Sequence, residues 1–457
     1  MGSGFQHIKN ISLASIAFIM LAGTTHVVSA ETLPEALASA YAGNPTLRAE
    51  RARQRGTDEQ VPQALSGWRP TVTAQGSVAQ SWSDTNTSKT VDNTPASVTI
   101  SLSQPIFRGF KTINGTREAE ANVQAGRQNL LSVEQDVLFQ GIQAYMNVIR
   151  DRQIVGLRQK NVGVLRQELN AANERFKVGE ITRTDVAQSR ARVAQSQAAV
   201  AAAAANLSAS VAAYEKVIGH NPGSLKYPRV AKLPSNLDAA QAEAVEVNPN
   251  ILAAAYVEEA STYNIEVVKG DLLPVLSVNA SATVTDHPQD GVKRSDREVI
   301  EGVLTVPLYE AGRVYSAVRQ SKQVASQRRL QVIQAGRAVR EDVSNSWHFL
   351  EAARQAIQAN KAQVSANQLA LDGVRQEYLV GSRTTLDVLN AQSDVVTARI
   401  ALVSSERDQI VSAYQILGSV GKLTARDLHL SVEYYDADEN YQAVRGKWFG
   451  TGANIVE

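Results

Sequence analysis

The chain has no cysteine among its 457 residues. This absence excludes disulfides, thiolate chemistry and an N-terminal cysteine that carries a lipid. Aromatic residues are also scarce, at 5% against 44% for all hydrophobic residues. Few of the bulky rings that fill compact cores are therefore available. Alanine-rich runs such as 198–205 instead favour helices that pack closely side by side.

No excess of charge of either sign is present. The 46 Lys and Arg residues nearly balance the 45 Asp and Glu residues, for a net charge of +1. Such a balance gives no indication of a nucleic-acid-binding surface. Beyond residue 30 the histidines are widely spaced and show no paired pattern typical of metal ligands: His220, His287, His348 and His429. Phosphate-binding loops and nucleophile elbows are absent as well. The sequence therefore predicts neither an enzyme nor a bound metal or cofactor.

Long hydrophobic runs are missing, since no stretch reaches the roughly 20 apolar residues of a spanning helix. The N-terminus carries Lys9, a short apolar segment over 11–23, and small residues at Val28-Ser29-Ala30. This pattern is typical of a secretory signal peptide over residues 1–30. The alternative is a buried N-terminal helix. With a signal peptide, the mature protein leaves the cytoplasm without a helical anchor.

What the sequence does contain is a duplication. Gly179 recurs as Gly381 (381 − 179 = 202), and Asp185 recurs as Asp387 (387 − 185 = 202). Other landmarks recur in the same order along most of the chain, which predicts two tandem halves. The expected divisions are a first repeat over 31–218, a connector over 219–235, a second repeat over 236–430 and a C-terminal periplasmic tail over 431–457.

Each half contains a long helical hairpin, predicted over about 109–217 and 311–418. The first arm of each hairpin has no proline, and at 1.5 Å per residue it forms a rod on the order of 100 Å long. A rod of that length cannot bury its apolar stripe within a compact domain. The sequence therefore indicates a coiled coil, a helical barrel or a long bundle.

Each half also contains two segments with alternating apolar and polar residues. The predicted strands cover about 71–83 and 97–105, and about 274–285 and 299–308, with polar loops over 84–95 and 286–297. One apolar face fits either a soluble sandwich or a membrane barrel. Each strand pair stands alone between helices, which favours the barrel. Because membrane barrels need about eight strands, several chains must contribute. Two chains would supply eight strands and three would supply twelve, and arithmetic leaves both open.

The two Val-Gly turns and the strand pairs ending in Gln104-Pro105-Ile106-Phe107 and Val306-Pro307-Leu308-Tyr309 resemble the TolC family of outer-membrane efflux channels. The resemblance covers about residues 31–430 and includes the duplication. It implies a mainly α fold with a membrane β-barrel. A homotrimer would have a 12-stranded barrel and a 12-helix coiled-coil tunnel, and the connector over 219–235 would form an equatorial belt. Without cysteine, the chain resembles the unlipidated branch of this family.

The resemblance also implies a function. Such a protein is a passive, gated exit duct in the outer membrane of a Gram-negative bacterium, with its barrel in outer-membrane lipid and its helices in the periplasm. It would serve an inner-membrane pump of the RND or ABC type and a periplasmic adaptor (membrane fusion protein) in drug efflux or type I secretion. The alternative from the residues alone is a soluble periplasmic coiled-coil adaptor or scaffold. That class has no membrane strands and normally a single hairpin.

The resemblance places a gate latch near the turns. Tyr378 and Arg383 match its hydrogen-bond donors, Thr184 and Asp185 match its acceptors, and Glu168 falls at a further latch position. An arginine and a carboxylate can form a charge-assisted pair that still breaks when a partner docks. In the alternative interpretation, Asp185 only caps its helix and Arg383 is a solvated turn residue.

Asp387 would form a ring of three carboxylates if three hairpins meet on an axis, and such a ring favours cations. Family members often carry a second acid one turn later, where this chain has Asn390, so weaker cation binding is expected. The alternative is that Asp387 only complements the helix dipole.

The two turns also match adaptor-docking sites, at Val178 and Gly179 and at Val380 and Gly381. The missing side chain of each glycine would allow close approach of a partner. Both glycines are also expected to end their helices in a left-handed conformation.

Overall fold

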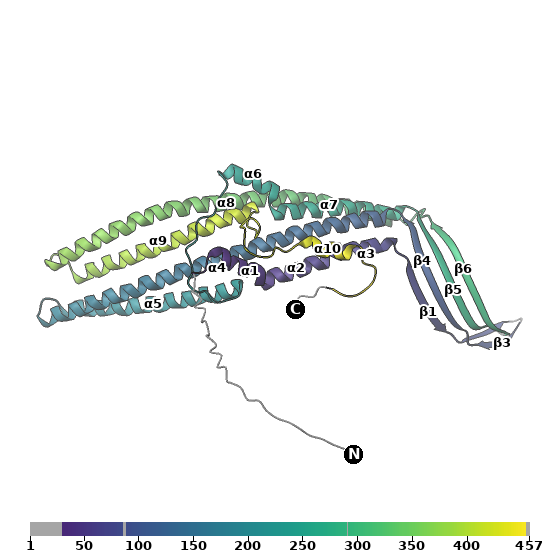
Figure 1. The fold of residues 1–457 in the computed structure, drawn as a ribbon, viewed down its shortest axis with the longest axis horizontal. Helices are drawn as coiled ribbons and strands as arrows, with labels where there is room; N and C mark the ends of the chain where they lie inside the picture. Colours follow the sequence, from purple (N-terminus) through teal and green to yellow (C-terminus); the bar gives the residue numbers. More distant parts are fainter. Residues whose placement is uncertain (1–29, 86–87, 290, 454–457) are drawn as a thin grey trace, which may run out of the picture.

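The computed structural model describes residues 30–85, 88–289 and 291–453. The predicted signal peptide over 1–30 thus lies outside the described residues, apart from Ala30. The molecule is elongated, with two pairs of antiparallel helical rods at one end and a curved sheet at the other (Figure 1). None of the described helices is both long enough and apolar enough to cross a membrane.

The rods are the two predicted hairpins. The first consists of α4 (Lys111–Lys177) and α5 (Arg183–Ile218), and the second of α8 (Arg313–Leu379) and α9 (Thr385–Val420). Both α4 and α8 have 67 residues, which corresponds to about 100 Å. These helices confirm the predicted mainly α, duplicated architecture.

Shorter helices precede each hairpin. The first set is α1 (Leu33–Gly43), α2 (Pro45–Asp58) and α3 (Gln60–Leu65), and the second is α6 (Leu237–Val247) and α7 (Pro249–Lys269). The caps repeat as well, since the side chain of Asn44 accepts a hydrogen bond from the backbone N–H two residues on, and Asn248 does the same. A proline at the first helical position follows each cap.

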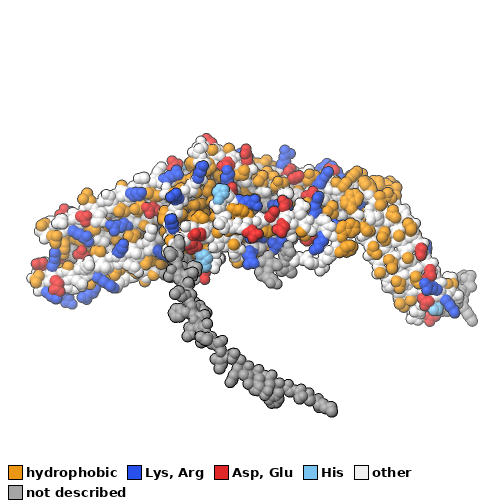
Figure 2. All heavy atoms as spheres, in the orientation of Figure 1, with side chains coloured by type: hydrophobic (Ala, Val, Ile, Leu, Met, Phe, Trp, Pro, Cys, Tyr) orange, Lys and Arg blue, Asp and Glu red, His pale blue; other side chains and the backbone are white. Residues whose placement is uncertain are grey.

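A four-stranded antiparallel sheet joins the two halves, in the order β1 (Thr71–Val78), β4 (Ala96–Arg108), β5 (Val275–Gln289) and β6 (Val292–Thr305). One face carries hydroxyl and amide pairs across the strands, including Thr73–Ser101 at 2.7 Å and Thr99–Thr283 at 3.0 Å. The other face is apolar and exposed in the single chain, with Ile300 82% exposed. Figure 2 shows hydrophobic side chains gathered at this end of the molecule, whereas charges are spread over the rods.

The predicted loops were wrong. The segment over 84–95 contains a hairpin of β2 (Ser81–Thr85) and β3 (Ser88–Asn93), and the segment over 286–297 continues β5 and β6 almost to their turn. These strands have no alternating apolar residues that would predict them from the sequence. A hairpin in solvent is held by hydrogen bonds between its backbones and does not need an apolar face. Strand ends also differ. β4 passes Pro105 through a register shift, and β6 stops at Thr305, short of the predicted residue 308.

The main core lies near the middle of the rods, where α1, α4, α5 and α9 meet. Tyr145 and Tyr214 are fully buried there. The hydroxyl of Tyr145 lies 2.8 Å from the carbonyl oxygen of Glu31 and 2.6 Å from that of Lys226, and the hydroxyl of Tyr214 donates to the Glu31 carboxylate. These bonds hold the start of the described chain and the segment after α5 against the rods.

The C-terminal tail is more ordered than its weak periodicity indicated. Residues Ala437–Arg445 form α10, and the side chain of Asp436 caps its N-terminus. This helix packs against α2 and α3. The helix α10 is too short to show a clear periodic pattern of apolar residues. Asp436 could nevertheless have been identified in the sequence as an N-terminal helix cap.

Candidate gate at the helical turns

The two interhelical turns have the same backbone geometry. Gly179 has φ of 78° and Gly381 has φ of 81°, in the left-handed region that favours glycine. The N–H of Glu180 donates to the carbonyl of Arg175, and the N–H of Ser382 donates to that of Glu377, both at 3.0 Å. These bonds satisfy carbonyls at the end of each long helix. The two turns therefore share one local structure.

Both predicted aspartates take part in capping boxes. The Thr182 N–H donates to Asp185 Oδ2 at 3.0 Å, and the Thr384 N–H donates to Asp387 Oδ2 at 2.9 Å. The backbone and hydroxyl hydrogen bonds from Thr384 lower the pKa of Asp387 below its ordinary 3.8. Asp387 therefore stays negatively charged at neutral and mildly acidic pH.

The predicted latch donors contact their own hairpin. Arg383 Nε donates to Glu377 Oε2 at 2.7 Å, and the Tyr378 hydroxyl lies 3.2 Å from Thr385 Oγ1. Within one chain the structure does not bring Arg383 to Asp185, and Thr184 is exposed. The guanidinium of Arg175 on α4 does lie 4.7 Å from the centre of the Tyr378 ring. This cation–π contact joins the two hairpins near the turns.

Glu168, also predicted at the latch, does connect the hairpins. Its carboxylate lies 3.7 Å from Arg375 Nη2 on α8. The same Arg375 nitrogen donates to Gln392 Oε1 at 3.2 Å, and Gln392 Nε2 donates to Asn161 Oδ1 on α4 at 3.2 Å. The network crosses from α4 to α8, to α9 and back to α4. Arg375 Nε is buried without a partner among the described residues, which leaves donor capacity that another arrangement could use.

A second contact supports this network. Arg192 Nη2 on α5 donates to Asn390 Oδ1 on α9 at 2.6 Å. Beside it, Leu165, Val193 and Leu389 form a small buried cluster from three different helices. Asn390 is thus the acceptor of a bond between the hairpins, at the position where the sequence indicated only a missing acid.

Sequence reasoning missed Arg375, Arg192 and Gln392 as functional candidates. Arg375 lies three residues before Tyr378 and so on the same side of its helix. That spacing is a signal that could have found it. Its partners, however, lie on two other helices, Glu168 on α4 of the first repeat and Gln392 on α9, and neither periodicity nor capping patterns predict such pairs.

Comparison with known proteins decides the family. A family model described as "Outer membrane efflux protein" matches residues 36–220 and 240–422. The outer membrane efflux protein BepC of Brucella suis is 40% identical over 98% of this chain and 97% of its own length. The chain belongs to the outer membrane efflux protein family.

More distant members of the efflux family agree with this assignment. The outer membrane protein TolC of Escherichia coli is 25% identical over 90% of this chain and 86% of its own length. The crystal structure of the CmeC outer membrane channel of Campylobacter jejuni has a TM-score of 0.77, with 14% identity, and the match covers 91% of this chain and 89% of that chain. The predicted fold class is thereby confirmed.

The efflux-family assignment confirms the predicted function and location. The protein is an outer-membrane exit duct whose helical part lies in the periplasm. Channels of this family are trimers that work with periplasmic adaptors and inner-membrane pumps, and they are not enzymes. Over the described ranges, no group of His, Asp or Glu side chains is arranged to hold a metal ion.

The turns of this efflux protein also expose apolar side chains. Val178 is 72% exposed and Val380 is 80% exposed. A Cβ atom added at Gly179 or Gly381 would meet nothing within 4 Å. Each turn therefore presents an apolar side chain next to open space, although the φ values still favour glycine.

Proposed function

We propose that three copies close their four-stranded sheets into one twelve-stranded barrel, and that the hairpins gate the tunnel beneath it. Among the described residues, β1 and β6 each pair with one neighbouring strand only. Their free edges can pair with the next copy, which satisfies the backbone groups that lipid leaves without partners. The exposed apolar face, with Ile100 at 54% and Ile300 at 82%, then meets lipid.

The gate is the set of polar contacts between the hairpins. Arg375 to Glu168 and Arg192 to Asn390 hold the second hairpin against the first. Opening the tunnel requires the hairpins to separate, so these contacts must break. Because they are ionic or amide bonds at partly exposed positions, each is weak enough to be exchanged when a partner binds.

A second layer of the gate lies at the turns in the assembled trimer. There Tyr378 and Arg383 donate to Thr184 and Asp185, as the family resemblance implies. The proposal is supported by the exposure of Arg383, whose side chain is 50% exposed. An exposed pair with Glu377 contributes little stability and can be exchanged for another carboxylate.

Asp387 supplies the charge at the constriction. Three copies place three carboxylates around one axis, and the lowered pKa keeps them charged. Such a ring favours cations over anions. Val178, Gly179, Val380 and Gly381 form the docking surface for the adaptor hairpins. The duct itself performs no catalysis, and the pump supplies the energy.

The main support for the proposed gate is the contact of Arg375 with Glu168. Conductance in planar lipid bilayers tests whether this contact keeps the tunnel closed. Arg375→Ala should raise the mean conductance of the purified trimer. Arg354→Ala, at an exposed position of the same helix α8, is the matched control and should conduct like the parent. Equal conductance in all three proteins would remove Arg375 from the gate.

A further inference from the structure

The C-terminal tail follows α4 toward the sheet. Three residues of α4 bind the chain that follows α9, from Ala425 into the tail, and they are each seven positions apart (134 − 127 = 7 and 127 − 120 = 7), or about 10 Å along the helix axis. The contacts are Ala425 N to Glu134 Oε1 (2.7 Å), Arg127 Nη2 to Asp438 Oδ1 (2.5 Å) and Arg445 Nη2 to Glu120 Oε1 (2.9 Å). Because α4 begins at Lys111, next to the strands, the tail approaches the sheet in steps of about two helical turns.

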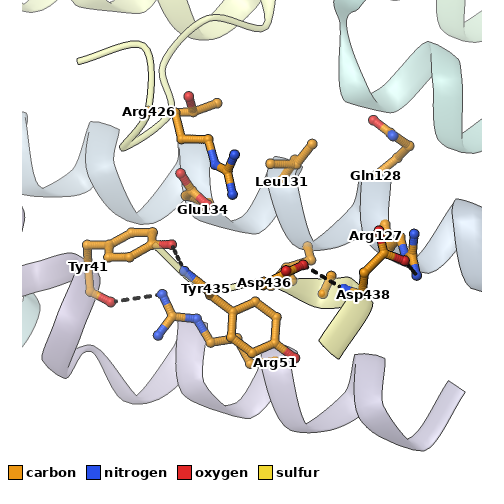
Figure 3. A pocket seen from close by; sticks show the side chains of 13 residues that line it. Tyr41, Arg51, Arg127, Gln128, Leu131, Glu134, Arg426, Tyr435, Asp436 and Asp438 are labelled. Carbon is orange, nitrogen blue, oxygen red and sulfur yellow. Dashed lines mark hydrogen bonds and ion pairs between the residues drawn. The ribbon is translucent and has the colours of Figure 1, made fainter. Parts of the chain in front are cut away.

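The tail is also held against α1 and α2. The N–H of Tyr435 donates to the Tyr41 hydroxyl at 3.0 Å, and Asn440 Nδ2 donates to Asp58 Oδ2 at 2.8 Å. The guanidinium of Arg51 lies between two rings, 4.5 Å from the centre of Tyr41 and 5.2 Å from that of Tyr435 (Figure 3). These contacts fix the path of the tail up to α10.

After α10 the tail reaches the level where the sheet begins. Arg69, two residues before β1, donates from Nη1 to the carbonyl oxygen of Lys447 at 2.8 Å. The Arg69 guanidinium also lies 4.8 Å from the centre of the Trp448 ring. Beyond this contact the apolar surface is free, with Trp448 58% exposed and Phe449 87% exposed.

Other exposed aromatic residues lie at the junctions between helices and strands. Trp68 precedes Arg69 directly and is 38% exposed, Phe110 separates β4 from α4 and is 52% exposed, and Tyr309 follows β6 and is 81% exposed. Aromatic rings gather at the boundary between membrane and water, where an apolar body meets lipid and polar groups stay hydrated. The junction level therefore has the composition of such a boundary.

We propose that Trp448 and Phe449 insert into the periplasmic leaflet of the outer membrane, so that the tail fastens the helical part of each chain to phospholipid. The Arg69 guanidinium lies beside the Trp448 ring, Lys447 precedes both rings in the chain, and the two residues carry the charge that attracts anionic headgroups. The position at the foot of the lipid-facing sheet and this charge pattern favour phospholipid over a second copy of the chain as the occupant.

Tryptophan fluorescence tests this insertion directly. The chain has four tryptophans, so Trp68→Phe, Trp82→Phe and Trp347→Phe leave only Trp448. The trimer is reconstituted into vesicles containing phosphatidylglycerol, with bromine placed either near the headgroup or deep in the acyl chains. We expect shallow bromines to quench Trp448 strongly and deep bromines to quench it weakly. Access to aqueous acrylamide without bromine quenching would overturn the proposal.

A matched control places the reporter at the other end of the molecule. Phe176 is the second-last residue of α4, just before the turn between α4 and α5, and is 45% exposed. The turns between the rods lie at the opposite end of the molecule from the sheet (Figure 1). In a variant without native tryptophan (Trp448→Phe added), Phe176→Trp should be quenched by acrylamide and not by brominated lipid. Equal quenching at both positions would also overturn the proposal.

A second experiment replaces Phe449 with a photo-crosslinking residue and leaves all native tryptophans in place. It tests the proposal even if the fluorescence variants do not assemble. Irradiated native membranes should yield an adduct of the chain with phospholipid, detected by mass spectrometry. An adduct with a neighbouring copy would show that Phe449 lies in a protein interface instead, and would refute insertion.

Discussion

Arg375 of α8 lies 3.7 Å from Glu168 of α4, so that one ion pair joins the second hairpin to the first. The side chains are 36% and 30% exposed, which places the pair between a solvated surface pair and a buried one. A pair of this kind contributes up to about 1 kcal/mol. It can therefore bias the position of the hairpins without preventing their separation.

Loss of this pair should shift the gate measurably. If the three copies open together, Arg375→Ala removes up to about 3 kcal/mol in total, which corresponds to a change of up to roughly 100-fold in the ratio of closed to open channels. Glu168→Gln should act in the same direction with a smaller effect, because a hydrogen bond to Arg375 remains possible. Single-channel recording measures both ratios, and a shift of the opposite sign would contradict the assignment.

The second contact should add to the first. Arg192→Ala removes the bond to Asn390 on α9 and should also raise open probability. Arg190→Ala, at an exposed position of the same helix α5, is the control and should leave it unchanged. Because both contacts hold one movable hairpin, the double variant with Arg375→Ala should open more than either single variant. A double variant no more open than Arg375→Ala alone would argue against two parallel contacts.

Ion selectivity should depend on Asp387. Asp387→Asn should weaken the preference for cations in reversal-potential measurements. Asp185→Asn is the comparison variant, because Asp185 has the same capping box and is proposed at the latch rather than at the ring, so its loss should change opening and not ion selectivity. Since hydrogen bonds from Thr384 lower the pKa of Asp387, the cation preference of the parent should persist at mildly acidic pH. Equal selectivity of both variants would exclude the ring.

The stability of the contact between α4 and the segment after α9 should depend on pH through Glu134, which accepts a hydrogen bond from the N–H of Ala425. This carboxyl is 7% exposed, and burial raises its pKa above the ordinary 4.5. At pH values between the pKa of Glu134 in the unfolded chain and its pKa in the folded chain, the folded chain binds more protons. The contribution of Glu134 to stability is therefore greatest below the unfolded pKa, and it is lost as the pH rises through the folded pKa. Glu134→Gln keeps an acceptor for Ala425 and should flatten this dependence in thermal unfolding followed at pH 4 to 8. An unchanged slope would show that Glu134 does not titrate in this range.

Adaptor docking should be sensitive to the exposed turns. Val380→Asp places a charge on the proposed docking surface and should reduce cross-linking to the adaptor and export in cells. Val380→Thr keeps the shape of the side chain and should retain most of both. Amounts of heat-resistant trimer serve as the control for assembly, and normal cross-linking of Val380→Asp would place docking elsewhere.

Much of the fold could be predicted because it follows from repeated local signals. Gly179 and Gly381 mark the ends of long helices, and Thr182 and Thr384 start the return arms with the same capping box. These patterns act within a few residues. The hairpin of β2 and β3 lacked such a signal, since polar strands held by backbone bonds resemble loops in sequence.

The candidate gate was less predictable than the fold. The resemblance pointed to Glu168, which does contact the other hairpin, but Arg375 was missed because its partners lie on α4 and α9. The ring role of Asp387 stays a prediction. Arg383 illustrates the same limit. Its observed partner within one chain is Glu377, only six residues away, and not the predicted acceptor Asp185.

The most direct test of the gate fixes the distance between α4 and α8 at positions 168 and 375. Since the chain has no cysteine, Glu168→Cys with Arg375→Cys introduces the only thiols. We expect this double variant to conduct more than the parent in lipid bilayers. A short reversible thiol crosslinker should then lower its conductance, and a reducing agent should restore it. Conductance that stays the same before crosslinking, after crosslinking and after reduction would contradict a gate between these two helices.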